Sequence, residues 1–364
     1  MKILFVAPNL NAGGAEKVFV TIVNNLSEIG YNCEVILLKK EGKLLDRLSE
    51  DIVVHDVGNG NIIYKLFALK KLISEKSPDL VFSIIGHVNV MLAFLKFFFF
   101  RRLRFVAREN AVHSVWFKQD INLKKKILLI LYKILLKKLD LVIVQTEFMK
   151  TDVINMFRLK ESQVVVISNP IDFEQIDYLK NQPLDNEILW DESKEHIIAV
   201  GRLEDVKDYP RMIQMMKKIP DNFVLDIFGI GKENKNLKTL IYEINVEDKV
   251  FLHGYNRNVY KYMTNSEFLI ITSKRESFPN VVIEANACSI PALSLNIPGG
   301  ISEVISIDNI NGKIFDKECE LENFIKNGEF KYFSKSKIRD FAEENFSISD
   351  FMDKILKVII SKGD

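Results

Sequence analysis

The sequence contains few cysteines, and their spacing argues against a structure held together through sulfur. Only three occur among 364 residues, at positions Cys33, Cys288 and Cys319. An odd number of widely separated cysteines matches neither a disulfide framework nor a zinc site. We therefore expect reduced core thiols in a cytoplasmic protein.

Long apolar runs are also missing. No stretch reaches the roughly 18–20 apolar residues that a helix needs to span a bilayer. The opening residues Met1–Pro8 are too short for a signal peptide and lead directly into a turn, which is typical of a first core strand. We therefore expect neither a membrane span nor a secretory leader.

Net charge is nearly absent, but the two halves of the chain differ in sign. The total is +1 at pH 7. Residues 1–165 carry 25 Lys+Arg and 16 Asp+Glu (25 − 16 = +9), whereas residues 166–364 carry 25 and 33 (25 − 33 = −8). A basic half followed by an acidic half favours two units with different roles.

What is present is a repeated alternation of strand-like and helix-like segments, which predicts parallel, doubly wound sheets. In the first half we expect strands at 3–6, 33–38, 80–85, 104–107, 141–145 and 164–168, and helices at 14–28, 62–75, 88–99 and from 147 onward.

The apolar periodicity is lost over residues 173–195 and resumes at residue 196, so we interpret 173–195 as a linker between two Rossmann-like α/β domains, 1–172 and 196–346. In the second domain we expect strands at 196–201, 224–228, 250–252, 268–271 and 292–295, and helices at 208–218, 232–244, 257–264 and 279–288. A last amphipathic helix is expected over about 347–361, and periodicity does not place it.

The stretch after the predicted strand 268–271 has features that are typical of an anion-binding site. Glu276 lies in a polar turn, Pro279 marks the start of a helix, and Glu284 lies inside that helix. The first N–H groups of a helix point outward together with the positive end of its dipole, so they attract phosphate. We therefore expect a pocket for a polar, phosphorylated ligand here.

Four other loops follow predicted strands, and the carboxyl ends of the parallel strands of one sheet meet at one ligand-binding edge. The first turn carries Gly13 and Gly14, which either admit a ligand to the backbone or only form a tight turn. In the second domain, Arg202 and Lys207 follow the first strand, where Arg can fork onto phosphate and Lys can act as a point charge, although a solvated charge cluster is the simpler alternative. Glycine turns at 229–231 and 298–300 also follow strands of the second domain, so together with 201–207 and 276–284 they place four polar or glycine-rich loops at one edge of one sheet.

Together these motifs resemble the family 4 retaining glycosyltransferases of the GT-B fold, also described as glycosyl transferases group 1. The resemblance rests on Gly13-Gly14-Ala15-Glu16, on the 201–207 segment, on the pair Glu276 and Glu284, and on the segments 169–172 and 298–300. It extends from about residue 1 to 315. It implies two facing Rossmann-like domains with a catalytic cleft between them, an N-terminal acceptor domain, and a C-terminal helix (347–364) that packs back onto that domain.

The resemblance also implies the roles of individual residues. Arg202 and Lys207 would hold the donor diphosphate and act in catalysis, Glu276 would bind the donor sugar at the reacting centre, and Glu284 would bind the ribose. The remaining donor-binding residues would be Gly13, Gly14, Gly229, Ser277, Phe278, Pro279, Asn280 and Val281. A metal would not be required, because cations and helix amides serve the diphosphate, and no cofactor is expected.

The chain departs from this family at two places. Many relatives have a histidine in the loop after the fourth strand, where this chain has Glu109 and Asn110; His87 or His113 are alternative acceptor-side candidates. Each histidine could equally be structural. The usual glycine after Cys288 is replaced by Ser289.

Basic and aromatic residues gather in residues 96–138, which hold 12 Lys+Arg and two acids. Residues 123–138 could form a basic amphipathic helix that lies on an anionic leaflet. The alternative is an ordinary helix with solvated lysines. Nucleic-acid binding is not expected, because no recognition module is present.

The sequence therefore predicts a metal-independent retaining glycosyltransferase at the inner face of the cell membrane. It would move a hexose or N-acetylhexosamine from a nucleotide sugar, most simply a UDP-sugar, to a polyprenyl-diphosphate-linked or cell-surface glycan in polysaccharide, lipopolysaccharide or capsule biosynthesis. The alternatives are a non-hydrolysing nucleotide-sugar epimerase and a catalytically silent binding protein.

Overall fold

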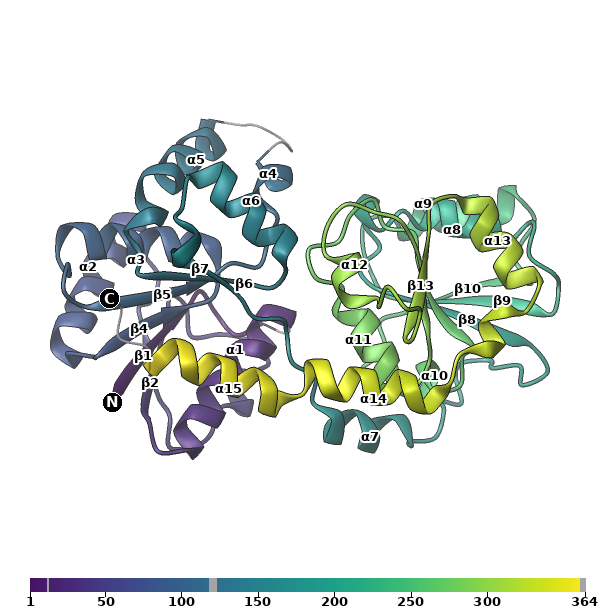
Figure 1. Ribbon diagram of the computed structural model, residues 1–364, viewed down its shortest axis with the longest axis horizontal. Coiled ribbons are helices and arrows are strands. Elements are labelled where there is room, and N and C mark those ends of the chain that lie inside the picture. Colours follow the sequence, from purple (N-terminus) through teal and green to yellow (C-terminus); the bar gives the residue numbers. More distant parts are fainter. Residues whose placement is uncertain (12, 118–122, 361–364) are drawn as a thin grey trace. The chain divides into compact units, whose positions relative to one another are not determined.

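A computed structural model describes residues 1–11, 13–117 and 123–360 (Figure 1). The chain forms two compact units. The first contains Met1–Asn169 together with the C-terminal stretch from Phe351, and the second contains Pro170–Asp350. Each unit has its own parallel sheet.

The first unit is built on a seven-stranded parallel sheet in the order β3-β2-β1-β4-β5-β6-β7. The order reverses direction between β1 and β4, and such a switch point is where open α/β sheets bind ligands. The strands are β1 (Lys2–Ala7), β2 (Asn32–Leu37), β3 (Val53–Asp56), β4 (Leu80–Ser83), β5 (Arg104–Arg108), β6 (Leu141–Val144) and β7 (Val164–Val166).

Helices cover both faces of this sheet (Figure 1). The central strands are buried on both sides and so consist almost wholly of apolar residues, as in Ile3–Ala7 of β1. The helices are α1 (Gly14–Glu28), α2 (Ile62–Lys76), α3 (Gly86–Phe98), α4 (His113–Trp116), α5 (Leu123–Leu135) and α6 (Glu147–Phe157), with short 3₁₀ turns at 45–47, 136–138 and 161–163.

The second unit is built on a six-stranded parallel sheet in the order β10-β9-β8-β11-β12-β13. Its switch point lies between β8 and β11, next to the predicted donor loops. The strands are β8 (Glu195–Val200), β9 (Phe223–Phe228), β10 (Val250–Gly254), β11 (Phe268–Ile271), β12 (Ala292–Leu295) and β13 (Gly312–Phe315); the helices are α7 (Phe173–Lys180), α8 (Tyr209–Met215), α9 (Asn234–Glu243), α10 (Tyr260–Met263), α11 (Asn280–Ala287), α12 (Ile301–Val304), α13 (Glu318–Lys326) and α14 (Lys335–Phe346), with 3₁₀ turns at 205–207 and 329–332.

The last helix, α15 (Ile348–Ile360), begins in the second unit and continues in the first. Phe351, Met352 and Ile355 are buried, and so are Val358 and Ile359. The Arg104 guanidinium of β5 donates hydrogen bonds to the carbonyl oxygens of Ile359 at 2.7 Å and Val358 at 2.5 Å. These bonds satisfy carbonyls that a helix end leaves without intrahelical partners.

The segment expected to be a linker, 173–195, contains a packed helix. Asp172 caps α7 through its side chain, which accepts from the Gln175 N–H at 2.9 Å, and Ile176 is buried in the core of the second unit. The Asp185 carboxylate accepts from Lys261 at 2.6 Å and Tyr262 at 2.9 Å. The segment thus belongs to the second unit. Its sequence is mostly polar because only one face of it packs on the core.

The prediction of three core thiols is wrong for one cysteine. Cys33 and Cys288 are buried, and burial raises the pKa of each to about 12. Cys319 is exposed in the first turn of α13. The apolar spacing of α13 places Leu321, Phe324 and Ile325 in the core and leaves position 319 on the outer face.

Across the described part of the chain, none of the helices combines the length and the apolar character that crossing a bilayer requires.

Candidate active site

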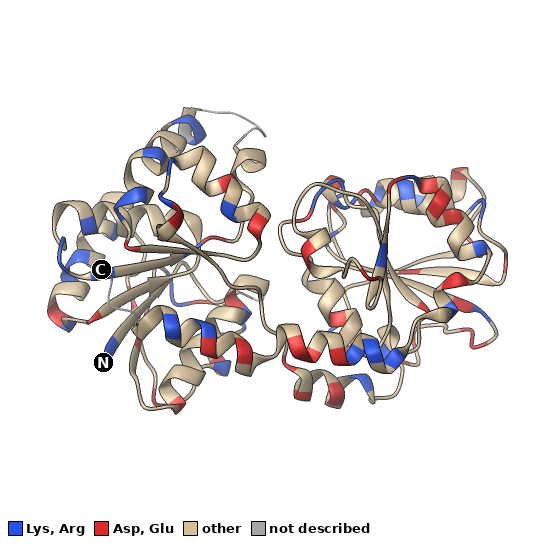
Figure 2. Ribbon diagram, viewed as in Figure 1, with Lys and Arg blue, Asp and Glu red and all other residues tan. Residues whose placement is uncertain are grey.

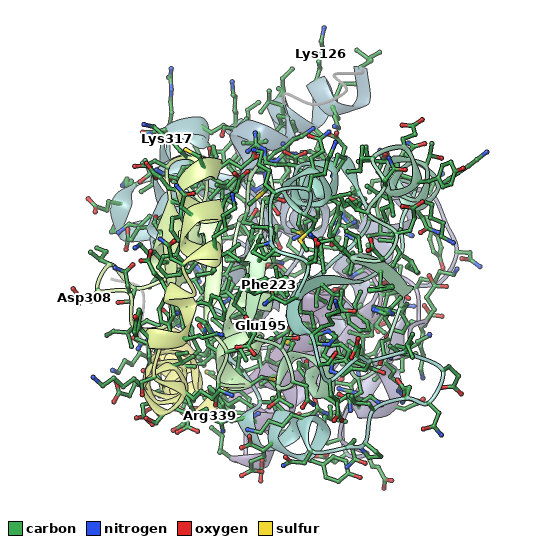
Figure 3. All side chains as sticks on the ribbon, turned by 90° about the vertical axis from the view of Figure 1, so that its right-hand side faces the viewer. Lys126, Glu195, Phe223, Asp308, Lys317 and Arg339 are labelled. Atoms are coloured by element: carbon green, nitrogen blue, oxygen red, sulfur yellow. The ribbon has the colours of Figure 1, made fainter. Side chains whose placement is uncertain are left out.

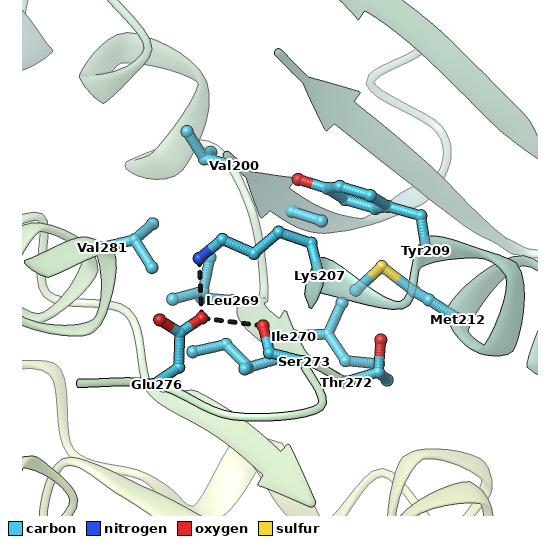
Figure 4. A pocket seen from close by; sticks show the side chains of 12 residues that line it. Val200, Lys207, Tyr209, Met212, Leu269, Ile270, Thr272, Ser273, Glu276 and Val281 are labelled. Carbon is cyan, nitrogen blue, oxygen red and sulfur yellow. Dashed lines mark hydrogen bonds and ion pairs between the residues drawn. The ribbon is translucent and has the colours of Figure 1, made fainter. Parts of the chain in front are cut away.

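The centre of the second unit's site is an ion pair between Lys207 and Glu276 (Figure 4). Lys207 ends a 3₁₀ turn after β8, and Glu276 lies in the turn after β11. Lys207 Nζ lies 2.6 Å from Glu276 Oε1, and the Ser273 hydroxyl donates to the same oxygen at 2.7 Å. Both ion-pair side chains are mostly buried, with 23% and 11% of their surfaces exposed. The sequence prediction did not assign a role to Ser273.

Glycines allow the loops at this edge to touch through their backbones. A Cβ on Gly299 would lie 1.6 Å from the Glu276 carbonyl oxygen, and the Gly300 N–H donates to that oxygen at 2.9 Å. The Glu276 N–H in turn donates to the Pro298 carbonyl at 3.1 Å. The 298–300 loop therefore fixes the position of Glu276. Such a close backbone approach requires glycine at position 299, because any side chain there would collide with Glu276.

A second glycine contact holds the Arg202 loop. A Cβ on Gly229 would lie 1.8 Å from the Gly201 carbonyl oxygen, and one on Gly231 would lie 2.2 Å from the Leu203 carbonyl oxygen. The loops after β8 and β9 therefore pack directly on each other. Gly229 has a structural role here, which leaves its predicted role in donor binding untested.

The Arg202 side chain pairs with a residue of its own loop. Its Nη1 donates to Glu204 Oε1 at 3.0 Å, and 76% of the Arg202 side chain is exposed. The role of Arg202 at the donor phosphate stays a prediction. A long, exposed arginine can change rotamer at little energetic cost, so its position here reflects the surface pair with Glu204.

The helix α11 begins beside the ion pair. Pro279 precedes its first residue Asn280, and Val281 lines the small cavity next to Lys207 and Glu276. Ser277 and the buried Phe278 form the turn that leads into the helix, and Glu284 lies in its second turn, partly exposed. The predicted donor residues Ser277 to Glu284 therefore form one continuous turn and helix.

The cavity at this site is small, about 10 Å³, because the ion pair and apolar side chains fill it. Tyr209 of α8 also lines it, although the sequence analysis did not identify this residue. Burial, and then the charge of Glu276, raise the pKa of the Tyr209 hydroxyl above its usual range. The phenol is therefore a neutral hydrogen-bonding group throughout the physiological pH range.

A larger pocket lies in the first unit at the sheet edge near its switch point. Its volume is about 390 Å³, which is within the usual range for a small-molecule site. Four elements contribute to it, namely α1, α3, the loop and helix after β5, and α5. The lining residues are Ala15, Glu16, Ile85, Gly86, His87, Glu109, Asn110, Ala111, His113, Trp116, Leu128 and Tyr132.

All four predicted acceptor-side residues line this pocket, but their environments differ. His87 is exposed, whereas His113 is buried and its Nε2 lies 2.9 Å from Glu109 Oε2. Asn110 donates to the Ile84 carbonyl and accepts from Gln145 at 2.6 Å. Asn110 therefore also braces the loop after β5.

The first glycine turn borders the same pocket. Gly13 is the N-cap of α1 and Gly14 its first residue. A Cβ on Gly13 would lie 2.2 Å from Glu16 Oε2, so glycine leaves room for this carboxylate. Burial raises the pKa of Glu16, which lines the pocket. The sequence analysis quoted Glu16 in a motif without giving it a role.

The basic stretch 96–138 is only partly a surface. Lys96 is buried and pairs with Asp140 at 2.7 Å, Arg104 binds the end of α15, and Arg108 is fully buried. These three are therefore not available to a membrane, which corrects the expectation for them. Lys118 and Asp120 lie outside the described residues.

The outer face of α5 combines apolar and basic side chains. Leu123, Ile127, Ile130 and Ile134 are each at least half exposed and follow the spacing of one helix face. Lys126 projects away from the body of the unit (Figure 3), and Lys133, Lys137 and Lys138 are exposed beyond it. Figure 2 shows basic residues along this helix.

Within residues 1–11, 13–117 and 123–360, no group of three or more His, Cys, Asp or Glu side chains is arranged to hold a metal ion.

Comparison with known proteins gives matches over both units. Residues 12–175 match the model for Glycosyltransferase Family 4, and residues 181–327 match the model for Glycosyl transferases group 1.

Two curated relatives illustrate the similarity in sequence. One is the N-acetylgalactosamine-N,N'-diacetylbacillosaminyl-diphospho-undecaprenol 4-alpha-N-acetylgalactosaminyltransferase of Campylobacter jejuni, 27% identical over 356 residues, covering 92% of this chain and 93% of the relative. The other is the amylovoran biosynthesis glycosyltransferase AmsD of Erwinia amylovora, 24% identical over 300 residues, covering 82% and 81%.

Solved structures share the fold. Anabaena Alr3699/HepE in complex with UDP has a TM-score of 0.79 at 19% identity and covers 99% of both chains. Sucrose-phosphate synthase from Thermosynechococcus elongatus has a TM-score of 0.80 at 15% identity and covers 99% and 98%.

Proposed function

This chain belongs to the family 4 glycosyltransferases of the GT-B fold, and from that premise we propose its reaction. It transfers a hexose or N-acetylhexosamine from a UDP-linked donor, with retention of configuration, to a lipid-linked or cell-surface glycan. The single observation that carries this proposal is the Lys207–Glu276 pair next to the start of α11.

The donor assignment is supported by the charges at this edge. Negative charge develops on the diphosphate as the glycosidic bond breaks, so a cation and helix-start N–H groups stabilise the transition state more than the ground state. Lys207 forms an ion pair with Glu276 at 2.6 Å. A bound diphosphate gives Lys207 a second anionic partner and leaves Glu276 oxygens to accept from sugar hydroxyls. The choice of UDP is supported by the HepE structure, which contains UDP.

The two carboxylates Glu276 and Glu284 position the donor in this proposal and transfer no proton. Glycosidases need two carboxyl groups that flank one bond, one as acid and the other as base or nucleophile. Here Glu276 is engaged by Lys207 and Ser273. With Lys207 and the helix start serving the phosphates, the reaction proceeds without a metal ion.

A lipid-linked acceptor is supported by the Campylobacter relative, whose name specifies a diphospho-undecaprenol acceptor. The outer face of α5 suits such a substrate, because an apolar stripe flanked by lysines binds at the surface of an anionic bilayer. Each basic residue near the surface contributes about 1 kcal/mol. We accordingly place the chain at the cytoplasmic leaflet as a peripheral protein.

Donor binding can be tested by thermal-shift measurements with UDP-, GDP- and ADP-sugars. We expect a UDP-sugar to raise the melting temperature of the second unit, and the Lys207→Met variant to lose most of that rise. A rise with only GDP- or ADP-sugars would contradict the choice of nucleotide, and an equal rise in the variant would contradict the role of Lys207.

A further inference from the structure

The charge pattern of the first unit's pocket bears on which sugars it can admit. Two carboxylates, Glu16 and Glu109, line the pocket, and none of its described lining residues is Lys or Arg. Among the described lining residues the cationic candidates are His87, which is exposed, and His113, which already pairs with Glu109. The pocket is therefore electronegative, in contrast to the lysine-rich outer face of α5.

Glu109 is held in one orientation by buried neighbours. Its Oε1 accepts from Asn89 Nδ2 at 2.8 Å, and its Oε2 lies 2.9 Å from His113 Nε2. Asn89 is fully buried, accepts from the Ser83 hydroxyl at 2.6 Å, and also donates to the Arg108 carbonyl at 2.9 Å. Four elements thus fix the carboxylate. Each carboxylate oxygen keeps a lone pair for another donor.

The remaining walls of the pocket are apolar. Trp116 and Leu128 line it together with Tyr132, whose hydroxyl would collide at 2.1 Å with a Cβ on Gly86. Apolar walls with a few fixed polar groups are what small-molecule sites use to combine affinity with specificity. A sugar ring offers both surfaces, because its C–H faces are apolar and its hydroxyls donate hydrogen bonds.

We propose that this pocket is a subsite for a neutral, hydroxyl-bearing sugar of the acceptor, and that Glu109 and Glu16 exclude acidic sugars. The proposal deepens the proposed function and rests on it for the acceptor role. Glu109 accepts a hydrogen bond from a sugar hydroxyl. A hexuronic acid would instead bring a third carboxylate beside two, with no Lys or Arg among the described lining residues and with the pKa of His87 lowered by desolvation and by Lys65. Such like-charge contacts give specificity by repulsion. By the same reasoning, the diphosphate of a lipid carrier lies outside the pocket.

The pocket provides its own reporter for a binding test. The chain has two tryptophans, and Trp190 lies in the second unit, stacked on His196 at 3.7 Å. In a Trp190→Phe background, fluorescence comes from Trp116 alone. We would titrate this protein with the methyl glycoside of a disaccharide ending in N-acetylhexosamine, and with the matched disaccharide ending in hexuronic acid.

We expect a saturable change with the neutral disaccharide and binding at least about tenfold weaker with the acidic one, since a single unfavourable charged contact has roughly this effect. In Glu109→Gln the neutral disaccharide should lose about tenfold in affinity while the acidic one does not, so the preference shrinks. Glu16→Gln should also reduce the preference for the neutral disaccharide. The surface variant Glu75→Gln, on α2, should change neither affinity.

Equal or tighter binding of the acidic disaccharide, or no saturable change with the neutral one, would overturn the proposal. The titration requires no donor and no transfer. Charge-selective binding in a protein that transfers no sugar would therefore support the subsite while refuting the proposed function. Transfer to an acidic acceptor as rapid as to a neutral one would refute the subsite alone.

Discussion

Lys207 is the residue on which the proposed chemistry depends most. Its ammonium lies 2.6 Å from the Glu276 carboxylate and lines a cavity of about 10 Å³. A short 3₁₀ turn and the ion pair already hold the lysine in place, so in the proposed reaction little side-chain entropy would be lost when the donor binds.

Replacing Lys207 with Met should therefore reduce the rate of sugar transfer by about 100- to 1,000-fold, the usual effect of removing one group that stabilises developing negative charge. The matched control is Lys274→Met in the neighbouring turn, because Lys274 pairs with Asp205 at the surface and is 46% exposed. Transfer rates should separate the two variants, while circular dichroism should not. Near-normal transfer by the Lys207 variant would refute its role at the phosphate.

Glu34 of β2 makes the stability of the first unit sensitive to acid. Burial alone would raise the pKa of this carboxyl, but hydrogen bonds from Lys2, His55 and Lys76 outweigh it and lower the pKa to about 2. A lowered folded-state pKa stabilises the fold above the unfolded value of 4.5, and this contribution is lost as pH falls from 4.5 toward 2.

We therefore expect Glu34→Gln to lower the free energy of unfolding by on the order of 2 kcal/mol at pH 7. The difference from the parent protein should shrink steadily below pH 4.5. Urea unfolding of the Trp190→Phe background, followed through Trp116, measures it in the first unit. A difference that stays constant down to pH 3 would contradict the proposed ion cluster.

At the scale of elements, the two faces of α5 have different surroundings, one at the pocket and one at the surface. Leu128 and Tyr132 line the pocket, while Ile127, Ile130 and Ile134 are exposed on its outer face. The helix is held by its inner side, with Tyr132 and Leu135 in the core of the first unit. Its outer side is thus free to change without loss of the fold.

Changing Lys126, Lys133 and Lys137 together to Glu should release the protein from vesicles that contain anionic lipid, because three attractive charges become repulsive. The matched control is the triple change of Lys232, Lys235 and Lys238 to Glu, since these lysines are exposed at and before α9 in the second unit. Vesicle sedimentation provides the readout. Equal sedimentation of both variants would remove the membrane assignment from α5.

Elements with a strong apolar pattern were predictable from sequence, whereas several elements with a weak apolar pattern were not. The strand β11 and the helix α1 have the predicted bounds. The edge strand β3 was missed because Val53 is 52% exposed and the strand has no buried alternation. The edge strand β13 was missed because two of its four residues, Gly312 and Lys313, interrupt the apolar pattern. The helix α7 was missed because its sequence is mostly polar.

In the candidate site, too, some residues were predictable from sequence and others were not. Loops at the ends of parallel strands predicted where Lys207 and Glu276 would be, because topology brings those loops together. The partners that orient a functional group could not be predicted in this way. Asn89 and Ser83 hold Glu109 from positions 20 or more residues earlier in the chain, and neither belongs to a recognisable motif.

At the scale of the whole molecule, the chain leaves the first unit after Asn169 and returns to it at Phe351. Arg108 contacts the chain both where it leaves the first unit and where it returns. Its guanidinium donates to Asn169 Oδ1 at 2.8 Å and lies over the Phe351 ring. Burial lowers the pKa of Arg108 to about 9. The end of α15 is therefore an integral part of the first unit.

Truncating Ile355 of α15 to Ala should destabilise the first unit by about 2–5 kcal/mol, as expected for a fully buried side chain. Ile360→Ala, at a position 63% exposed, should change the stability by less than about 0.5 kcal/mol. Urea unfolding reported by Trp116 distinguishes the two. Similar small effects for both would mean that α15 is not needed by the first unit.

The most direct test of the proposed function is the complete reaction. A labelled UDP-N-acetylhexosamine would be incubated with the protein, a polyprenyl-diphosphate-linked glycan with a neutral terminal sugar, and EDTA, and the anomeric configuration of the product would be read by NMR. We predict a product with the α configuration of the donor, formed at an unchanged rate in EDTA. An inverted product, or a reaction that stops when divalent metal is removed, would contradict the mechanism built on Lys207 and Glu276.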